Sequence, residues 1–113
     1  MIDQLNLTLR QPAPAVSADD VAALLRVLTD QPDWLTAGEI AALIGFTDRK
    51  VRAVAAAAMP HVVSYPGSPG YRLFSACTLE EINHCIEAFQ SQGRDMFKRS
   101  SLYLQAYHRR FRG

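Results

Sequence analysis

The stretch that decides the fold runs from Trp34 to Met59 and reads W-L-T-A-G-E-I-A-A-L-I-G-F-T-D-R-K-V-R-A-V-A-A-A-A-M. It contains two helix starts, because Thr36 followed by Glu39 is the pattern of a capping box and Thr47 is a further N-cap residue. Gly45 lies between them, and glycine can end a helix in the left-handed conformation and let the chain turn sharply. The stretch predicts two short helices joined by a tight turn, with the tryptophan packed as a hydrophobic staple.

The segments on either side extend this pattern. We expect the helix pair at about 37–44 and 48–58, after a helix at about 18–29 that Ser17 caps. The run H-V-V-S-Y-P-G-S-P-G-Y-R-L-F at 61–74 has two strand-like pieces around two Pro-Gly pairs, which predicts a hairpin. This order predicts a mainly α fold with a small β-hairpin wing, a winged helix-turn-helix, which most often holds one helix in the major groove of DNA.

Three parts of the chain are expected. Residues 1–16 form an N-terminal strand or arm, because L-N-L-T-L at 5–9 alternates apolar and polar residues and is followed by a stiff Q-P-A-P-A connector. Residues 17–77 form the winged helix-turn-helix domain. Residues 78–113 form a C-terminal helical extension with a basic end, which Thr78 and Glu81 open as another capping box.

The bulk composition is that of one globular domain. The chain has 113 residues, of which 49% are hydrophobic and 20% charged. No apolar run approaches the roughly 20 residues that span a bilayer, and the first residues lack the pattern of a signal peptide, so we expect a cytoplasmic protein without a membrane partner. Cys77 and Cys85 are expected to be free thiols. The histidines do not form a metal-ligand spacing with them, and we predict no metal and no cofactor.

The charge of the chain is segregated, although the net charge is only +1. Residues 1–47 carry two basic and six acidic side chains, and residues 48–77 carry four basic and one acidic. Residues 78–93 carry three acidic side chains and no lysine or arginine, and residues 94–113 carry six basic and one acidic. Positive charge therefore lies in the second helix of the pair, the hairpin and the C-terminal end, where contact with phosphate groups would need it.

The helix at 48–58 has two distinct faces. At about 100° per residue, its valines and its last alanines share one arc, which we expect to be buried: Val51, Val54, Ala55 and Ala58. Arg49, Ala53 and Ala56 lie opposite, with Lys50 and Arg52 on the flanks. Small alanines allow close approach to base edges, and Arg49 in the first turn could hydrogen-bond guanine. We expect Lys50 and Arg52 to contact phosphates.

The hairpin is expected to add further contacts. Tyr71 and Leu73 share one face and should pack inward, which leaves Arg72 pointing outward toward a phosphate. Ser64 and Ser68 could also donate hydrogen bonds to phosphate. The predicted DNA-binding residues are Thr47, Arg49, Lys50, Arg52, Ser64, Ser68 and Arg72.

The C-terminal helix carries a seam of apolar or small residues spaced three and four apart, which is the heptad pattern of a helix that packs on another: Leu79, Ile82, Ile86, Phe89, Gly93, Met96, Ser100, Tyr103 and Tyr107. The seam is longer than a small domain needs, which suggests a homodimer through Phe89, Met96, Ser100, Tyr103 and Tyr107. Alternatively, the helix breaks near Gly93 and folds back, because glycine is unfavourable inside a helix. Leu102, Leu104 and Phe111 lie off the seam and suggest a second buried face.

Taken together, the chain resembles the small winged helix-turn-helix proteins of bacteriophages and prophages. The residues that carry the resemblance are W-L-T-A-G-E-I-A-A-L-I-G, T-D-R-K-V-R-A, V-V-S-Y-P-G-S-P-G-Y-R-L, T-L-E-E-I-N-H-C and S-Q-G-R-D-M-F-K-R-S, within about 20–110. The resemblance implies a DNA-associated or regulatory protein in a bacterial host cell. It implies no reaction and no operator.

Two functions follow as hypotheses. The first is a non-enzymatic regulator of transcription that reads the major groove of double-stranded DNA with the helix at 48–58. The second is a phage adaptor or inhibitor that binds a host protein through the same fold. The sequence shows no nucleophile–base pair and no phosphate-binding loop, so an enzyme is not expected.

Overall fold

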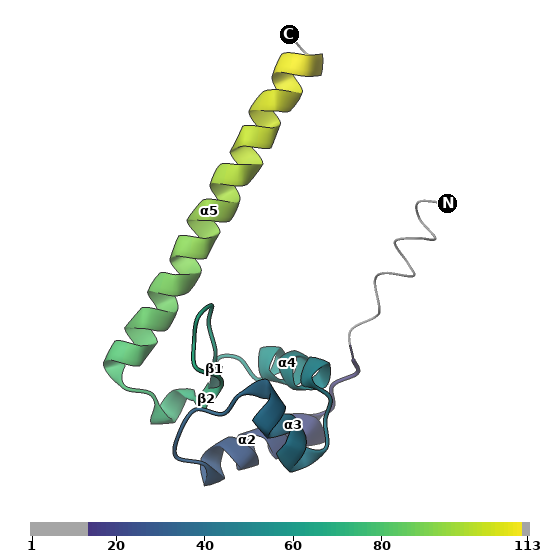
Figure 1. Cartoon of the computed structure of the whole chain (residues 1–113), viewed down its shortest axis with the longest axis vertical. Helices are drawn as coiled ribbons and strands as arrows, with labels where there is room; N and C mark the ends of the chain where they lie inside the picture. Colours follow the sequence, from purple (N-terminus) through teal and green to yellow (C-terminus); the bar gives the residue numbers. More distant parts are fainter. Residues whose placement is uncertain (1–13, 112–113) are drawn as a thin grey trace.

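The computed structural model describes residues 14–111, in which a small body of helices and a hairpin carries one long helix (Figure 1). The predicted strand at 5–9 and most of the predicted arm lie outside the described residues. The elements of the body are α2 (Ala18–Asp30), α3 (Ala37–Ile44), α4 (Asp48–Ala57), β1 (Val62–Val63), β2 (Arg72–Leu73) and a 3-10 turn, η1 (Phe74–Ala76). The long helix is α5 (Leu79–Phe111).

Local hydrogen bonds fix the ends of α3 and α4 where the sequence predicts them. The hydroxyl of Thr36 accepts from the backbone N–H of Glu39 at 3.1 Å, and the Glu39 carboxylate accepts from the backbone N–H of Thr36 at 3.0 Å. Gly45 ends α3 in the left-handed conformation with φ of 74°. The hydroxyl of Thr47 then caps α4 by accepting from the backbone N–H of Lys50 at 3.1 Å. The predicted pair of helices joined by a sharp turn is confirmed.

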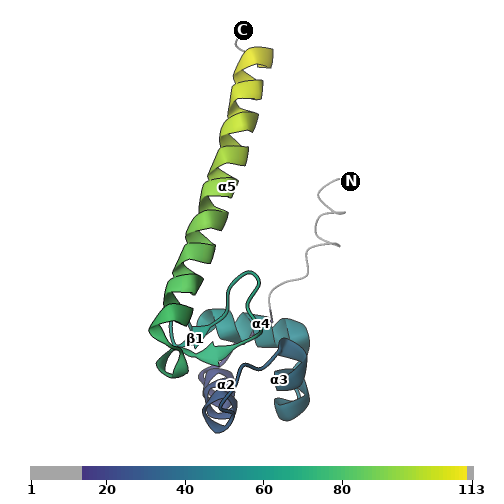
Figure 2. The same cartoon turned by 60° about the vertical axis from the view of Figure 1, so that its left-hand side comes forward.

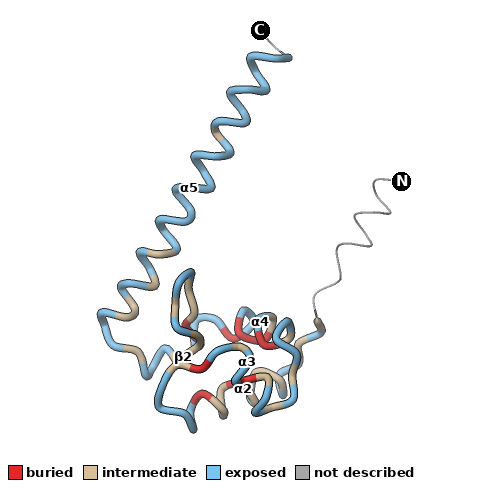
Figure 3. The backbone as a smooth tube through the Cα atoms, viewed as in Figure 1, coloured by how far each residue is buried: buried red, intermediate tan, exposed pale blue. Residues whose placement is uncertain are grey.

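The core lies among the three helices of the body and the first strand (Figure 3). Its fully buried side chains are Leu24 of α2, Ile40 of α3, and Val51 and Val54 of α4. Ala55 and Ala58 are buried beside them, so the predicted inward face of the α4 segment is confirmed. Burial of these aliphatic side chains provides the main stabilisation of the body.

The hairpin is attached to the helices through backbone hydrogen bonds. β1 and β2 pair antiparallel with Val62 opposite Leu73, and next to them Leu35 and Tyr71 form a bridge with hydrogen bonds of 3.0 and 2.7 Å. Gly70 has φ of 151°, and a Cβ at this position would overlap the backbone of Leu35. Only glycine therefore allows this close approach. Tyr71 and Leu73 pack against the core, as predicted.

The long helix α5 is continuous over 33 residues, so the predicted alternative of a break near Gly93 is wrong. The glycine sits on an open face, where a Cβ would meet no atom from elsewhere in the chain within 4 Å, and the helix continues through it. Figure 2 shows that only the first turns of α5 lie beside the hairpin. The radius of gyration is 18.4 Å, against about 13 Å for a compact chain of this size. The projecting helix accounts for this difference.

Candidate functional site

The outward face of α4 combines arginine side chains with small residues. Arg49, Arg52 and Ala56 are exposed on the side of α4 opposite its buried valines, and Ala53 between them is half-buried. Because alanine extends little beyond the backbone, a flat or convex partner can approach the helix closely here. The placement of these residues on an exposed face is as predicted.

Lys50 lies elsewhere than predicted. Its ammonium nitrogen is 3.4 Å from a carboxylate oxygen of Asp20 on α2 and 4.5 Å from the centre of the Phe46 ring. The long, flexible lysine side chain packs its stem on apolar surface and reaches the nearest carboxylate. Lys50 thus links α4 to α2 rather than standing on the flank of the outward face.

Asp20 has a second structural role at the start of α2. Its carboxylate accepts from the backbone N–H of Ser17 at 3.0 Å, which completes a capping box. This hydrogen bond, followed by the smaller effect of Lys50, lowers the pKa of Asp20 below its ordinary value of 3.8. Asp20 is therefore ionised near neutral pH and holds the lysine in place.

Two serines predicted to contact phosphate instead shape the hairpin loop. The hydroxyl of Ser68 donates to the carbonyl oxygen of Gly70 at 3.0 Å and accepts from the backbone N–H of Tyr65 at 3.3 Å. The hydroxyl oxygen of Ser64 lies 3.4 Å from that of Ser68. Both serines are half-buried. In the chain alone the loop backbone accepts the proton of Ser68, so this hydroxyl is not directed outward toward a phosphate.

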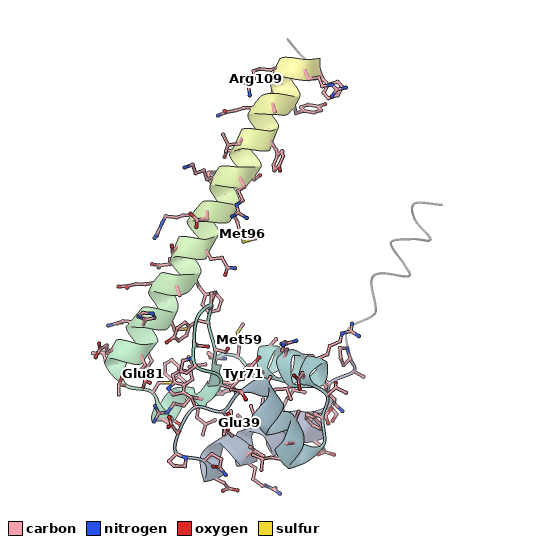
Figure 4. The ribbon with its side chains drawn as sticks, viewed as in Figure 1. Glu39, Met59, Tyr71, Glu81, Met96 and Arg109 are labelled. Carbon is pink, nitrogen blue, oxygen red and sulfur yellow. The ribbon has the colours of Figure 1, made fainter. Side chains whose placement is uncertain are left out.

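A shallow hollow of about 180 Å³ separates α4 from the hairpin. Arg52 and Ala56 form its α4 side, and Ser64 and Tyr71 form its hairpin side, with Met59 at the end of α4. Figure 4 shows Met59 and Tyr71 in this part of the body. An anionic group that enters the hollow would meet the Arg52 side chain.

Arg72 does not point outward, so this prediction is wrong. Its guanidinium donates to the Glu81 carboxylate at 3.2 and 3.4 Å and to the carbonyl oxygen of Pro32 at 3.1 Å. It also lies 5.9 Å from the Trp34 ring. Strand alternation fixes the direction of its Cβ, but the length of arginine lets the charged group turn back to a carboxylate on α5.

Glu81 joins α5 to the body. Its carboxylate caps α5 by accepting from the backbone N–H of Thr78 at 2.8 Å, as predicted, and it also accepts from the indole N–H of Trp34 at 3.0 Å. The pKa of Glu81 is lowered below its ordinary value of 4.5. The largest cause is the hydrogen bond from the backbone N–H of Thr78, and the indole N–H of Trp34 and the positive charge of Arg72 add to it. Figure 4 shows Glu81 at the foot of α5, against the hairpin.

Trp34 packs at this joint rather than in the main core. It is half-buried, and its ring meets that of Tyr65 edge-on with centroids 6.2 Å apart. Tyr65 in turn lies 5.4 Å from the His84 ring on α5. Sequence reasoning missed this cluster of Trp34, Tyr65, Arg72, Glu81 and His84. Its one visible signal was the capping box at the start of α5.

The described residues do not meet the requirements of a metal site, a disulfide or a membrane-spanning helix. Among residues 14–111, no group of three His, Cys, Asp or Glu side chains is arranged to hold a metal ion. The two cysteines are free, as predicted, and burial raises the pKa of both thiols. No helix within the same range is long and apolar enough to cross a membrane.

Comparison with known proteins adds no further assignment. No protein family model, no curated protein and no solved structure matches the chain.

Proposed function

We propose that the body is a winged helix-turn-helix that binds double-stranded DNA, with α4 in the major groove. The observation that carries the proposal is the exposed face of α4, on which arginines flank small residues directly after the sharp turn at Gly45. The bridge between Leu35 and Tyr71 supports it, because its two backbone hydrogen bonds attach the hairpin to the segment that leads into α3. Such a hairpin can act as the wing.

Each proposed contact has its own chemistry. Arg49 lies in the first turn of α4, where a recognition helix reaches base edges, and its guanidinium can donate two parallel hydrogen bonds to guanine. Arg52 borders the hollow beside the hairpin and is suited to a phosphate group. Thr47 is exposed at the N-terminus of α4, where the helix dipole also favours an anion.

The other residues of the predicted DNA-binding set support this interface indirectly. Lys50 fixes α4 against α2, Ser64 and Ser68 shape the loop of the wing, and Arg72 fixes the wing to α5. We place the direct contacts on Thr47, Arg49 and Arg52, which are exposed at the N-terminus and on the outward face of α4. With the resemblance to phage and prophage proteins, we propose regulation of transcription in the cytoplasm of a bacterial host cell, without a catalytic step.

Fluorescence anisotropy with a duplex selected from a random-sequence pool tests this proposal at several salt concentrations. Replacing Arg49 with alanine should cost about 1–3 kcal/mol of binding free energy and relax preference at one base pair. Arg52→Ala should weaken binding to all duplexes and reduce the salt slope by about one unit.

Arg26→Ala is the matched control, because it removes the same charge from an exposed position on α2, away from the proposed interface. It should leave affinity and salt slope almost unchanged. Equal losses for all three variants would contradict a specific role for α4. A wild-type chain that binds no duplex in a salt-dependent way would overturn the proposal and favour a host protein as the target.

A further inference from the structure

One apolar stripe runs along the whole length of α5 and is left largely exposed. Because successive residues of a straight helix are about 100° apart, Ile86, Phe89, Met96, Phe97 and Tyr103 fall on one side. All five are exposed. Leu104 and Phe111 lie on the same side, which corrects the prediction that they form a second face. Leu102 lies on the opposite side.

This stripe is too long for the body to cover. Side chains of its first half, including Ile82, Ile86 and Phe89, face Met59 and Phe74 across an apolar groove of about 290 Å³. Its second half projects beyond the body, and Met96 lies well above the hairpin in Figure 4. Contiguous exposed apolar surface of this extent usually marks an interface.

The charge of α5 changes sign along its length. Residues 79–93 contain three glutamates, of which Glu81 is paired with Arg72 of the same chain, and no lysine or arginine. Residues 94–111 contain five lysines and arginines and one aspartate. Two parallel copies of α5 would place like charges side by side in both halves. Two antiparallel copies would place the acidic half of each helix beside the basic half of the other.

We infer that α5 pairs with α5 of a second copy of this chain in antiparallel orientation, through the exposed stripe. The aromatic and basic end of one helix, with Tyr107 and Arg110, lies beside the acidic half of the other, near the groove at its foot. Gly93 and Ser100 lie within the stripe near the middle of the pair, where small side chains let two helices approach closely.

The two bodies then lie at opposite ends of a helix pair. A helix of 33 residues is about 50 Å long, which exceeds the roughly 34 Å of one turn of duplex DNA. The pairing does not depend on the proposed function. A chain that pairs but binds no DNA would contradict only the proposed DNA binding, and a monomer that binds DNA would contradict only the pairing.

Light scattering after size-exclusion chromatography of the full chain tests the pairing. Wild-type protein at tens of micromolar should have twice the mass of one chain. Leu104→Glu and Leu102→Glu form a matched pair, because the two leucines are 56% and 55% exposed but lie on opposite sides of α5. Leu104→Glu should raise the dissociation constant at least tenfold, and Leu102→Glu should leave it within about twofold. A monomeric wild type, or equal effects of the two changes, would overturn the inference.

Distances between spin labels test the orientation. A label is attached at His108→Cys, with Cys77 and Cys85 both replaced by serine. In an antiparallel pair, the labels of the two copies lie at opposite ends of the helix pair and are separated by well over about 20 Å. Each residue between the middle of the pair and the label adds about 1.5 Å per copy to this distance. A parallel pair holds equivalent positions within about 20 Å. A single short distance would therefore overturn the antiparallel arrangement.

Discussion

The body and α5 use the same kind of residue pattern with opposite results. In the body, apolar residues at helical spacing find partners within the chain, so that Leu24 of α2 and Val54 of α4 are completely buried. In α5 an equally regular pattern contains no fully buried residue. Figure 3 shows this contrast, with buried segments confined to the body. The spacing of apolar residues therefore predicts which face of a helix is apolar. Whether that face is buried depends on whether another element of the folded chain packs against it.

The largest expected effect on stability comes from replacing one leucine with alanine in each region. Leu24→Ala in the body should lower the free energy of unfolding by about 2–5 kcal/mol, since it leaves a cavity. Leu102→Ala in α5 should change it by no more than about 0.5 kcal/mol, because the side chain is already exposed. Urea unfolding followed by circular dichroism measures both.

The leucine in α5 is the internal control, because both variants lose the same atoms. Comparable losses of stability would break the comparison, since they would mean that this side of α5 is packed.

A smaller effect concerns the joint between the two regions. The pKa of Glu81 is lowered in the folded chain, so its contribution to stability is complete above its ordinary value of 4.5 and is lost as the pH falls through the lower folded value. Trp34, the one tryptophan of the sequence, donates to this carboxylate. Its fluorescence should therefore change below pH 4.5.

Two variants show whether the fluorescence change of Trp34 is caused by Glu81 or by another carboxyl group. Glu81→Gln should remove the transition, whereas Asp33→Asn should keep it, although Asp33 accepts from the backbone N–H of Trp34 at 2.8 Å. A transition that survives Glu81→Gln would show that another carboxyl group causes it.

Local features of the body could be predicted from the sequence. The capping boxes, the turn at Gly45 and the inward face of α4 depend on residues within a few positions of one another. The inward packing of Tyr71 and Leu73 follows from strand alternation in the same way.

The joint and the lysine contact could not be predicted, because they depend on distant residues. Arg72 reaches Glu81 and the carbonyl of Pro32, which is 40 positions away in the sequence. Lys50 reaches Asp20 on another helix. Long charged side chains have many conformers, and the nearest opposite charge in the folded chain selects among them. Lys50 and Arg72 therefore have structural partners that lie far from them in the sequence or on another element.

Chemical-shift mapping by NMR tests the proposed DNA interface most directly, because it asks which region contacts the duplex. On addition of a selected duplex, we expect shifts along the outward face of α4, at Arg49, Arg52 and Ala56, and in the hairpin loop at 65–70, with little change in α5 beyond Gly93. Shifts concentrated on the basic end of α5, or no shifts in α4, would contradict this interface.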